Sequence, residues 1–178
     1  VCGALTSHNG KDFAAIGEEL TANGYRFGAL VVDAVEFVPQ SRPRLFIVAV
    51  SDKVNVPAAL TTRKPCLWHP PALQEAQRKL GPTAQRNWFW WKLPAPPKRS
   101  LAFVDLIEDD PQGVMWHTPA QTRRLLSLMN ELHLAKVEAA KKLRTLVVGT
   151  VYKRTRPDPA QRGRRVQRAE VRFDNVAG

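Results

Sequence analysis

Apolar residues near the start of the chain recur at the spacing of a helix. Phe13, Ile16 and Leu20 lie three or four positions apart, which places them on one helical face. Gly24 then stands where a helix C-cap belongs, because glycine readily adopts the left-handed conformation that ends many helices. The pattern predicts a helix over residues 11–23.

Two short apolar runs follow, and both have the length of buried strands. The first lies at about residues 29–33, and the second, Leu-Phe-Ile-Val-Ala-Val, occupies residues 45–50. The loop between them is short enough for the two strands to pair as a hairpin or to lie next to each other. The first fifty residues are therefore expected to be compact α/β.

From about residue 51 prolines become frequent, and the regular elements are expected to be short. A modest helix is predicted over residues 71–80, with Pro71 at its start and Gly81 at its end.

The aromatic run Trp88-Phe89-Trp90-Trp91 comes next. A small, proline-rich domain needs large apolar side chains to form a core, so we expect this run to be core, which Trp68 and Trp116 could join. A base-stacking surface, flanked by Arg86 and Lys92, is the alternative.

The strongest helix signal begins after residue 117. Thr118 is a suitable N-cap, Pro119 occupies the first turn, and Gln121 completes a capping box. An apolar stripe, expected to be core, then runs toward Leu143, and Asn130-Glu131 could break it into two helices. The stripe consists of Leu125, Leu128, Met129, Leu132 and Ala135.

The last segment has the pattern of a β-ribbon. Residues 146–154 and 164–173 are strand-like, and the turn-rich segment 157–163 joins them. This ribbon is strongly basic. Its cationic residues are Lys153, Arg154, Arg156, Arg162, Arg164, Arg165, Arg168 and Arg172.

Charge is distributed unevenly along the chain. Residues 1–52 hold 4 Lys and Arg against 6 Asp and Glu, whereas residues 53–178 hold 23 against 10. The whole surplus of the +11 net charge therefore lies after residue 52. A polyanion is the expected partner of this segment, with nucleic acid ahead of a membrane surface, and a merely soluble basic surface is the alternative.

Composition argues against several other classes of protein. With 178 residues the chain holds one domain, or one domain and part of another, and no apolar run approaches the length of a membrane span. Two cysteines indicate a reducing, cytoplasmic location, and the histidines lack zinc-ligand spacing, so no metal is expected. Without an initial Met or a signal peptide, the chain is expected to be cut from a longer protein.

The loop before the second apolar run is the most informative segment. In Val38-Pro39-Gln40-Ser41-Arg42-Pro43-Arg44 the side chains of Gln40, Arg42 and Arg44 alternate, so an extended backbone would place them on one face. Two guanidinium groups so placed suit phosphate and base-edge contacts, and the flanking prolines limit backbone freedom. A solvated loop with ordinary surface arginines is the alternative.

The order of motifs resembles that of DNA cytosine-5 methyltransferases. Three segments in order are similar to the distal catalytic motifs of that family. They are Gly24-Tyr25, Leu30-Val31-Val32-Asp33-Ala34, and Phe37 to Val48, which contains the Gln-x-Arg-x-Arg element. Val1 resembles the last residue of the family's Glu-Asn-Val motif. The resemblance covers about residues 1–50 closely.

This resemblance implies an α/β fold: a partial Rossmann-type methyltransferase edge in residues 1–52, then an irregular α+β target recognition domain with a basic β-ribbon in residues 53–178. The intact enzyme would move a methyl group from S-adenosylmethionine to C5 of a cytosine flipped out of DNA, after attack by a cysteine thiolate. By position, Arg44 matches the arginine that contacts the flipped ring. Arg42 and Gln40 match residues that support the catalytic loop.

Other residues of the family's machinery are not matched. Pro65-Cys66 imitates the Pro-Cys of the nucleophile but follows the Gln-x-Arg-x-Arg element, which is the wrong order. Gly24 and Gly28 form no glycine-rich cofactor loop. The fragment alone is therefore expected neither to methylate DNA nor to bind S-adenosylmethionine.

The ribbon is the second candidate site. A two-stranded ribbon can enter the major groove of double-stranded DNA, where arginines reach guanine edges or hold phosphates. Non-specific phosphate contact or simple solubility is the alternative. The residues expected to contact DNA are Lys153, Arg154, Arg156, Arg164 and Arg165.

These observations lead to expectations about partners and setting. The intact enzyme is expected to be a monomer associated with bacterial DNA, as in restriction-modification, and the fragment could self-associate through an exposed strand edge. No membrane partner is expected. A free-standing module that binds single strands or RNA, without enzymatic activity, is the alternative.

Overall fold

The structure is a computed structural model that describes residues 2–158 and 160–178. Val1, and with it the resemblance to Glu-Asn-Val, lies outside the described residues, as does Pro159 of the predicted turn. The chain forms two compact units: the first holds the chain up to Phe37 together with Arg42–Lys98, and the second holds Val38–Ser41 and Arg99–Gly178. Helices and strands are mixed, and the three sheets among the described residues are each two-stranded and antiparallel.

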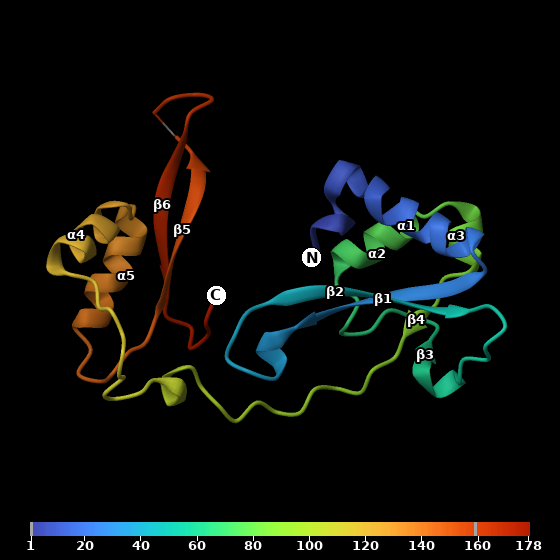
Figure 1. The fold of residues 1–178 in the computed structure, drawn as a ribbon, viewed down its shortest axis with the longest axis horizontal. Coiled ribbons are helices and arrows are strands. Elements are labelled where there is room, and N and C mark those ends of the chain that lie inside the picture. The colour runs from blue at the N-terminus through green and yellow to red at the C-terminus, as the bar shows by residue number, and fades with distance from the viewer. Residues whose placement is uncertain (1, 159) are drawn as a thin grey trace. The chain divides into compact units, whose positions relative to one another are not determined.

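The first unit contains three α-helices, one long antiparallel strand pair and one short one (Figure 1). Short 3-10 turns at Cys2–Leu5, Ser7–Gly10, Ala34–Glu36 and Ala58–Leu60 connect them. The elements are α1 (Lys11–Ala22), β1 (Tyr25–Asp33), β2 (Pro43–Ser51), β3 (Thr61–Thr62), α2 (Pro71–Arg78), α3 (Pro82–Arg86) and β4 (Trp90–Trp91).

The predicted helix over residues 11–23 is confirmed as α1. Its C-cap Asn23 donates its backbone N–H to Glu19 O, and Gly24 follows with φ +76°. A residue with a side chain would be strained at that angle, so glycine ends the helix there. The helix predicted over residues 71–80 is confirmed as α2, but Gly81 has φ −65° and is the N-cap of α3, a helix that the sequence pattern did not predict.

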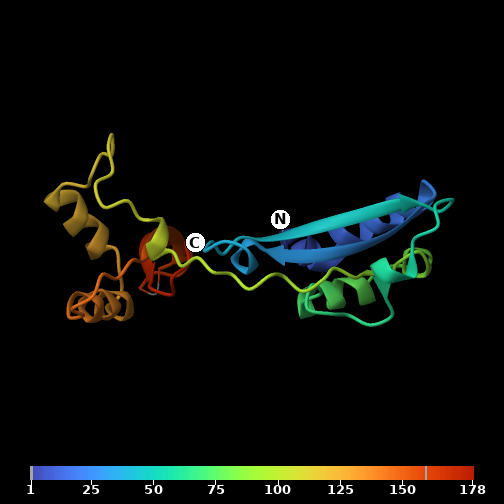
Figure 2. The same ribbon diagram turned by 90° about the horizontal axis from the view of Figure 1, so that it is seen from below.

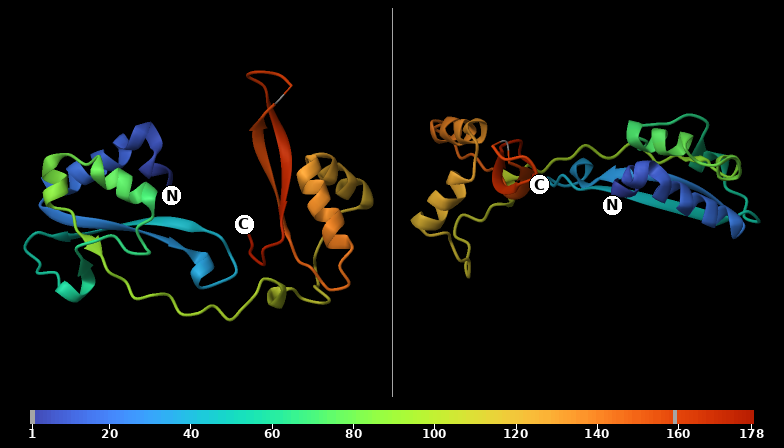
Figure 3. Two further views of the ribbon diagram at one scale, coloured as in Figure 1. Left: turned by 180° about the vertical axis from the view of Figure 1, so that it is seen from behind. Right: turned by 90° about the horizontal axis from the view of Figure 1, so that it is seen from above.

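The predicted hairpin is also confirmed. β1 and β2 pair from Tyr25 with Ser51 to Asp33 with Pro43, and β1 begins four residues earlier than predicted. Because directly paired residues share a face, Phe27, Ala29 and Val31 face the same side as Ala49, Ile47 and Leu45. α1, α2 and α3 cover this side (Figure 1), and residues 87–89, just before β4, pair with the edge of β1 away from β2 through the backbone N–H and C=O of Phe27. Seen from above, α1 and α2 lie side by side over the strands (Figure 3).

The aromatic run belongs to this core. Trp88 stands edge-on to Phe27 at 5.2 Å and to Trp90 at 5.1 Å between ring centroids, and both tryptophans pack on the buried cluster. Gly28 allows the backbone of Phe89 to pass close to β1, because a Cβ at Gly28 would lie 2.2 Å from the carbonyl oxygen of Phe89. Trp68 is buried as well, but Trp116 is 74% exposed, so the expectation that it could join the core is wrong.

The second unit consists of a helix pair and the ribbon. A 3-10 turn at Val104–Leu106 precedes α4. Figures 1 and 2 both show α4 and α5 on the same side of the ribbon. The elements are α4 (Pro119–Ser127), α5 (Glu131–Lys141), β5 (Thr150–Pro157) and β6 (Arg165–Arg172).

Both predicted helix boundaries in this unit are confirmed. The side chain of Thr118 accepts from the backbone N–H of Gln121, whose side chain accepts from that of Thr118, and this closes the capping box. Asn130 ends the first helical stretch and caps the second by accepting from the backbone N–H of His133 at 3.0 Å. Leu132 is 62% exposed, because the break at Asn130 turns it out of the stripe; its assignment to the core is wrong.

The ribbon of β5 and β6 matches the predicted one, with strands shifted by a few residues. Its helix-facing side buries only Ala169 and Val171, which form a small core with Met129. The outer edge of β6 is not free: Ala169 N–H donates to Leu128 O at 3.0 Å and Val171 N–H donates to His133 Nδ1 at 3.2 Å. Pairing with another strand at these two positions is therefore blocked.

The compact units do not divide at residue 52. The segment from 53 to 98 packs with the hairpin, because its tryptophans and α2 complete the hairpin's core. The positive charge does not follow this division, because residues 1–98 hold 12 Lys and Arg against 7 Asp and Glu, and residues 99–178 hold 15 against 9. The assignment of residues 1–52 and 53–178 to two functions stays a prediction, as does the Rossmann-type edge.

A membrane-spanning helix is absent from the described residues, since none of their helices has the required length and apolar character.

Candidate nucleic-acid interface

Asp33 fixes the two ends of the loop that carries the Gln-x-Arg-x-Arg element. Its Oδ1 accepts from Val35 N–H at 3.1 Å and from Arg42 N–H at 2.6 Å. One carboxylate oxygen thus ties the end of β1 to the start of β2 across the intervening loop. Sequence reasoning did not single out Asp33; the available signal was an aspartate directly after an apolar strand, a position where its side chain often binds nearby backbone N–H groups.

Arg42 and Arg44 lie at the start of β2 in the first unit. Arg44 pairs with Val32 of β1 and donates from Nη1 to Pro43 O at 2.9 Å, and Arg42 is exposed. Within residues 2–158 and 160–178, neither guanidinium has a carboxylate partner. Both therefore keep donors that can bind a phosphate or a base edge.

Gln40 belongs to the second unit, where the C-terminal segment holds its loop. Ser41 N–H donates to Ala177 O at 2.7 Å, Ala177 N–H donates to Pro39 O at 2.8 Å, and Gln40 forms an isolated bridge with Ala177. The element is thus divided: Arg44 on β2 and Arg42 directly before it belong to the first unit, whereas Gln40 is held by the second unit. The roles predicted for the three residues stay predictions.

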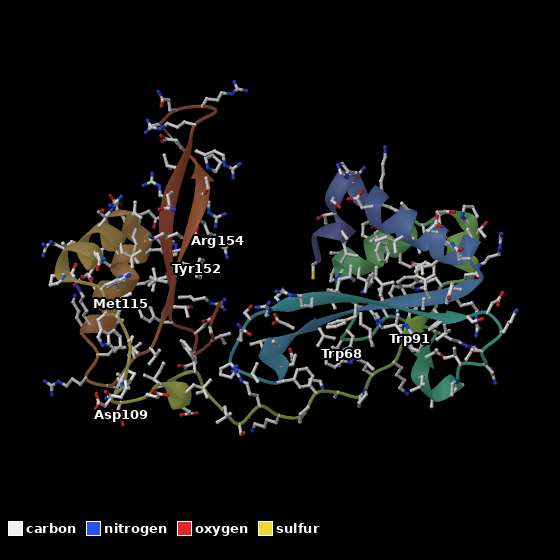
Figure 4. The ribbon with its side chains drawn as sticks, viewed as in Figure 1. Trp68, Trp91, Asp109, Met115, Tyr152 and Arg154 are labelled. Atoms are coloured by element: carbon white, nitrogen blue, oxygen red, sulfur yellow. The ribbon has the colours of Figure 1, made fainter. Side chains whose placement is uncertain are left out.

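The side of the ribbon away from the helices carries arginines that are already paired. Arg156 Nη2 lies 2.6 Å from Glu170 Oε1 and Arg154 Nε lies 3.7 Å from Glu170 Oε2. Arg154 also stacks over the ring of Tyr152 at 4.6 Å. Figure 4 shows Tyr152 and Arg154 projecting on the side opposite the helices. One carboxylate, on a side chain only 16% exposed, therefore orients two of the predicted DNA contacts.

The other three predicted contacts are placed differently. Lys153 is on the helix-facing side of β5, since it pairs with the buried Ala169. Arg165 donates to Thr155 O at 3.3 Å, and Arg164 in the turn lies 3.6 Å from Asp158 Oδ2. The five residues thus do not share one face.

Cys66 and His69 form a close pair that sequence reasoning did not predict. Sγ of Cys66 lies 3.3 Å from Nδ1 of His69, and that nitrogen accepts the Cys66 backbone N–H at 2.9 Å. Burial of His69, which is 1% exposed, lowers the pKa of its ring. Because Nδ1 of His69 already accepts the Cys66 backbone N–H, its lone pair is occupied within the turn, and the pair shapes that turn.

The two glycines next to and within β1 do not form a cofactor loop. Gly24 terminates α1, and Gly28 lies inside β1 beneath the backbone of Phe89, so neither belongs to a glycine-rich loop at a helix N-terminus. Likewise, within the described ranges no group of three or more His, Cys, Asp or Glu side chains could hold a metal ion.

Comparison with known proteins gives one match. A family model described as C-5 cytosine-specific DNA methylase matches residues 1–169, which is nearly the whole chain. Searches of curated proteins and of solved structures found no match.

Proposed function

The chain belongs to the C-5 cytosine-specific DNA methylase family, and from this premise we propose that it forms the substrate-side and DNA-recognition parts of a DNA cytosine-5 methyltransferase. The intact enzyme transfers a methyl group from S-adenosylmethionine to C5 of a cytosine flipped out of a specific DNA sequence. In this proposal the cysteine nucleophile, the catalytic glutamate and the cofactor site are supplied by other parts of the intact enzyme.

The observation that carries the proposal is the clamped loop before β2. Asp33 holds Arg42 N–H at 2.6 Å, and Arg42 and Arg44 emerge beside it without a carboxylate partner in the described chain. Charged donors on a fixed backbone lose little entropy when they bind a charged ligand. Arg44 contacts the flipped cytosine, and Arg42 and Gln40 support the catalytic loop and a neighbouring phosphate.

The second unit holds the DNA. Its ribbon carries 8 Lys and Arg against 3 Asp and Glu over residues 150–178, and phosphate neutralisation by such residues supplies most of the sequence-independent affinity of DNA-binding proteins. Specific recognition would come from the minority of side chains that reach base edges.

Bisulfite mapping of DNA from cells that express the full-length protein tests the proposal. We expect methylated cytosines at one short sequence context, and none at that context in the same host without the protein. The Arg44→Ala variant, produced at the same level, serves as the matched control and should leave that context largely unmethylated. Absence of any new methylation from a folded wild-type protein would contradict the proposed function.

A further inference from the structure

A pocket in the second unit combines the features of an anion site. It lies between α4 and the helix-facing side of the ribbon and has a volume of about 380 Å³. Leu125 of α4 and Leu128, which caps the C-terminus of that helix, form part of its wall, and no acidic side chain lines it. Its polar lining consists of His117, Gln121, Arg124, Lys153 and Gln167.

The two cations of this pocket differ from those on the opposite side of the ribbon. Arg154 and Arg156 are paired with Glu170, whereas the side chains of Arg124 and Lys153 make no hydrogen bond or ion pair within residues 2–158 and 160–178. They come from a helix and a strand and face one hollow without a counter-charge. Two like charges held in this way bind an anion more favourably than an ion-paired cation does, because no existing partner must be displaced.

The neutral side chains of the pocket add hydrogen-bond donors. Oε1 of Gln121 accepts the backbone N–H of Thr118 at 2.8 Å within the capping box, which leaves the amide NH2 of Gln121 to donate to a ligand. Together with Arg124 and Lys153 this gives a set dominated by donors, which matches the unprotonated oxygens of a phosphodiester.

An exposed apolar pair beside the pocket favours nucleic acid over a free anion. Met115 is 96% exposed and Trp116 is 74% exposed, and Trp116 directly precedes the pocket residue His117. Met115 lies in the part of the unit that holds α4 and α5 (Figure 4). Aromatic side chains stack on bases and methionines insert between base steps, whereas neither helps to bind an inorganic ion.

We propose that the α4–ribbon pocket binds a backbone phosphate of the DNA strand through Arg124 and Lys153, with Trp116 against a neighbouring base. The proposal rests on the proposed function and names a contact surface within it. Of the five ribbon residues expected from the sequence to contact DNA, Lys153 alone lies in this pocket.

Fluorescence anisotropy with a labelled DNA duplex, measured over a series of salt concentrations with the full 178-residue chain, tests this assignment. Arg124→Ala and Lys153→Ala should each weaken binding about tenfold, as expected for loss of a charged hydrogen bond. The double variant should lower the slope of log K against log salt by about one unit rather than two, because both cations neutralise the same phosphate. Arg123→Ala removes the same charge from the same helix outside the pocket and should have a small effect.

The outcomes separate the possible failures. Equal DNA affinity of Arg124→Ala and Arg123→Ala would overturn the pocket assignment. Circular dichroism checks that both variants are folded, and Arg124→Gln repeats the test with a polar side chain. Unchanged duplex affinity of Trp116→Ala would indicate a site for a free anion and would overturn the assignment to DNA. If the wild-type chain itself does not bind the duplex, the DNA-holding part of the proposed function fails instead.

Discussion

The β1–β2 hairpin and the β5–β6 ribbon share one architecture, two antiparallel strands, but bury very different surfaces. In β1 four consecutive residues from Phe27 to Leu30 are buried, and the helices together with Trp88 and Trp90 pack on the face that carries Phe27 and Ala29. In the ribbon only Ala169 and Val171 are buried, and both lie in β6. The hairpin therefore acts as a scaffold that positions a loop, whereas the ribbon leaves most of its side chains available for a ligand.

The largest effect expected from this difference concerns stability. Phe27→Ala should lower the free energy of unfolding of the first unit by about 3–5 kcal/mol, because it empties a site that is 0% exposed. Val171→Ala should lower the free energy of unfolding of the second unit by about 2 kcal/mol, because it removes fewer buried carbon atoms than Phe27→Ala. Tryptophan fluorescence during denaturant unfolding reports on the first unit, which contains four of the five tryptophans, and far-ultraviolet circular dichroism follows α4 and α5.

Phe46→Ala is the control for the hairpin. Phe46 is 50% exposed on the opposite face of the same pair of strands, so its removal should cost much less than that of Phe27. Equal losses for the two variants would contradict the assignment of the core to one face.

A smaller loss is expected at the clamp of the loop. Asp33→Ala leaves the N–H groups of Val35 and Arg42 without their acceptor and should cost about 1–3 kcal/mol. Asp33→Asn keeps an oxygen at the same position and should retain most of the stability. Denaturant unfolding measures both variants, and in the full-length enzyme Asp33→Ala should also slow methyl transfer, because Arg42 and Arg44 are less well held.

A result in which Asp33→Asn loses as much stability as Asp33→Ala would assign the effect to the negative charge rather than to the acceptor. Because one oxygen accepts both N–H groups, the geometry predicts that Asp33→Asn loses less stability than Asp33→Ala.

On the ribbon, the expected effect is a gain in DNA affinity. Glu170→Gln removes the counter-charge of Arg154 and Arg156 and should strengthen duplex binding several-fold at low salt, with a steeper salt dependence. Stability should change by no more than about 1 kcal/mol, since the arginines are exposed. Anisotropy titrations measure the gain, and weaker binding by this variant would mean that the Glu170 pairs hold the arginines in a binding geometry.

The smallest expected effect is a pH dependence confined to the first unit. Burial lowers the folded-state pKa of His69 below its ordinary value of 6.5, so below pH 6.5 the unfolded chain takes up a proton that the folded chain does not. Stability should therefore fall as pH is lowered through 6.5, and level off below the folded-state pKa. His69→Asn retains an acceptor for the Cys66 N–H and should flatten this part of the profile; an unchanged profile would assign the dependence to another group.

Features set by neighbouring residues were predictable from the sequence. The cap of α4 depends on Thr118, Pro119 and Gln121 alone, and the end of α1 depends on Gly24, so local chemistry determines both. The β1–β2 hairpin followed from two apolar runs joined by a loop. The Gln-x-Arg-x-Arg element indicated the family because motif order is visible in sequence.

Features set by distant residues were not predictable. The role of Asp33 depends on Arg42 returning to it in space, and the pairing of Arg154 and Arg156 depends on Glu170 of the other strand. Arg124 faces Lys153 only because α4 packs on the ribbon. The exposure of Trp116 likewise follows from packing, which apolar pattern alone does not determine.

The most direct test of the account compares Arg44→Ala with Lys153→Ala in the full-length enzyme. Single-turnover methyl transfer and duplex affinity are measured for both variants and for the wild type. We predict that Arg44→Ala slows methyl transfer at saturating DNA with little change in Kd, and that Lys153→Ala raises Kd and lowers the salt slope by up to about one unit with little change in the saturated rate. In this account Arg44 belongs to a scaffold that presents it to the substrate, and Lys153 belongs to a ribbon that holds DNA. Normal methyl transfer by Arg44→Ala would contradict this division, and so would a Lys153→Ala variant that lowers only the saturated rate of methyl transfer.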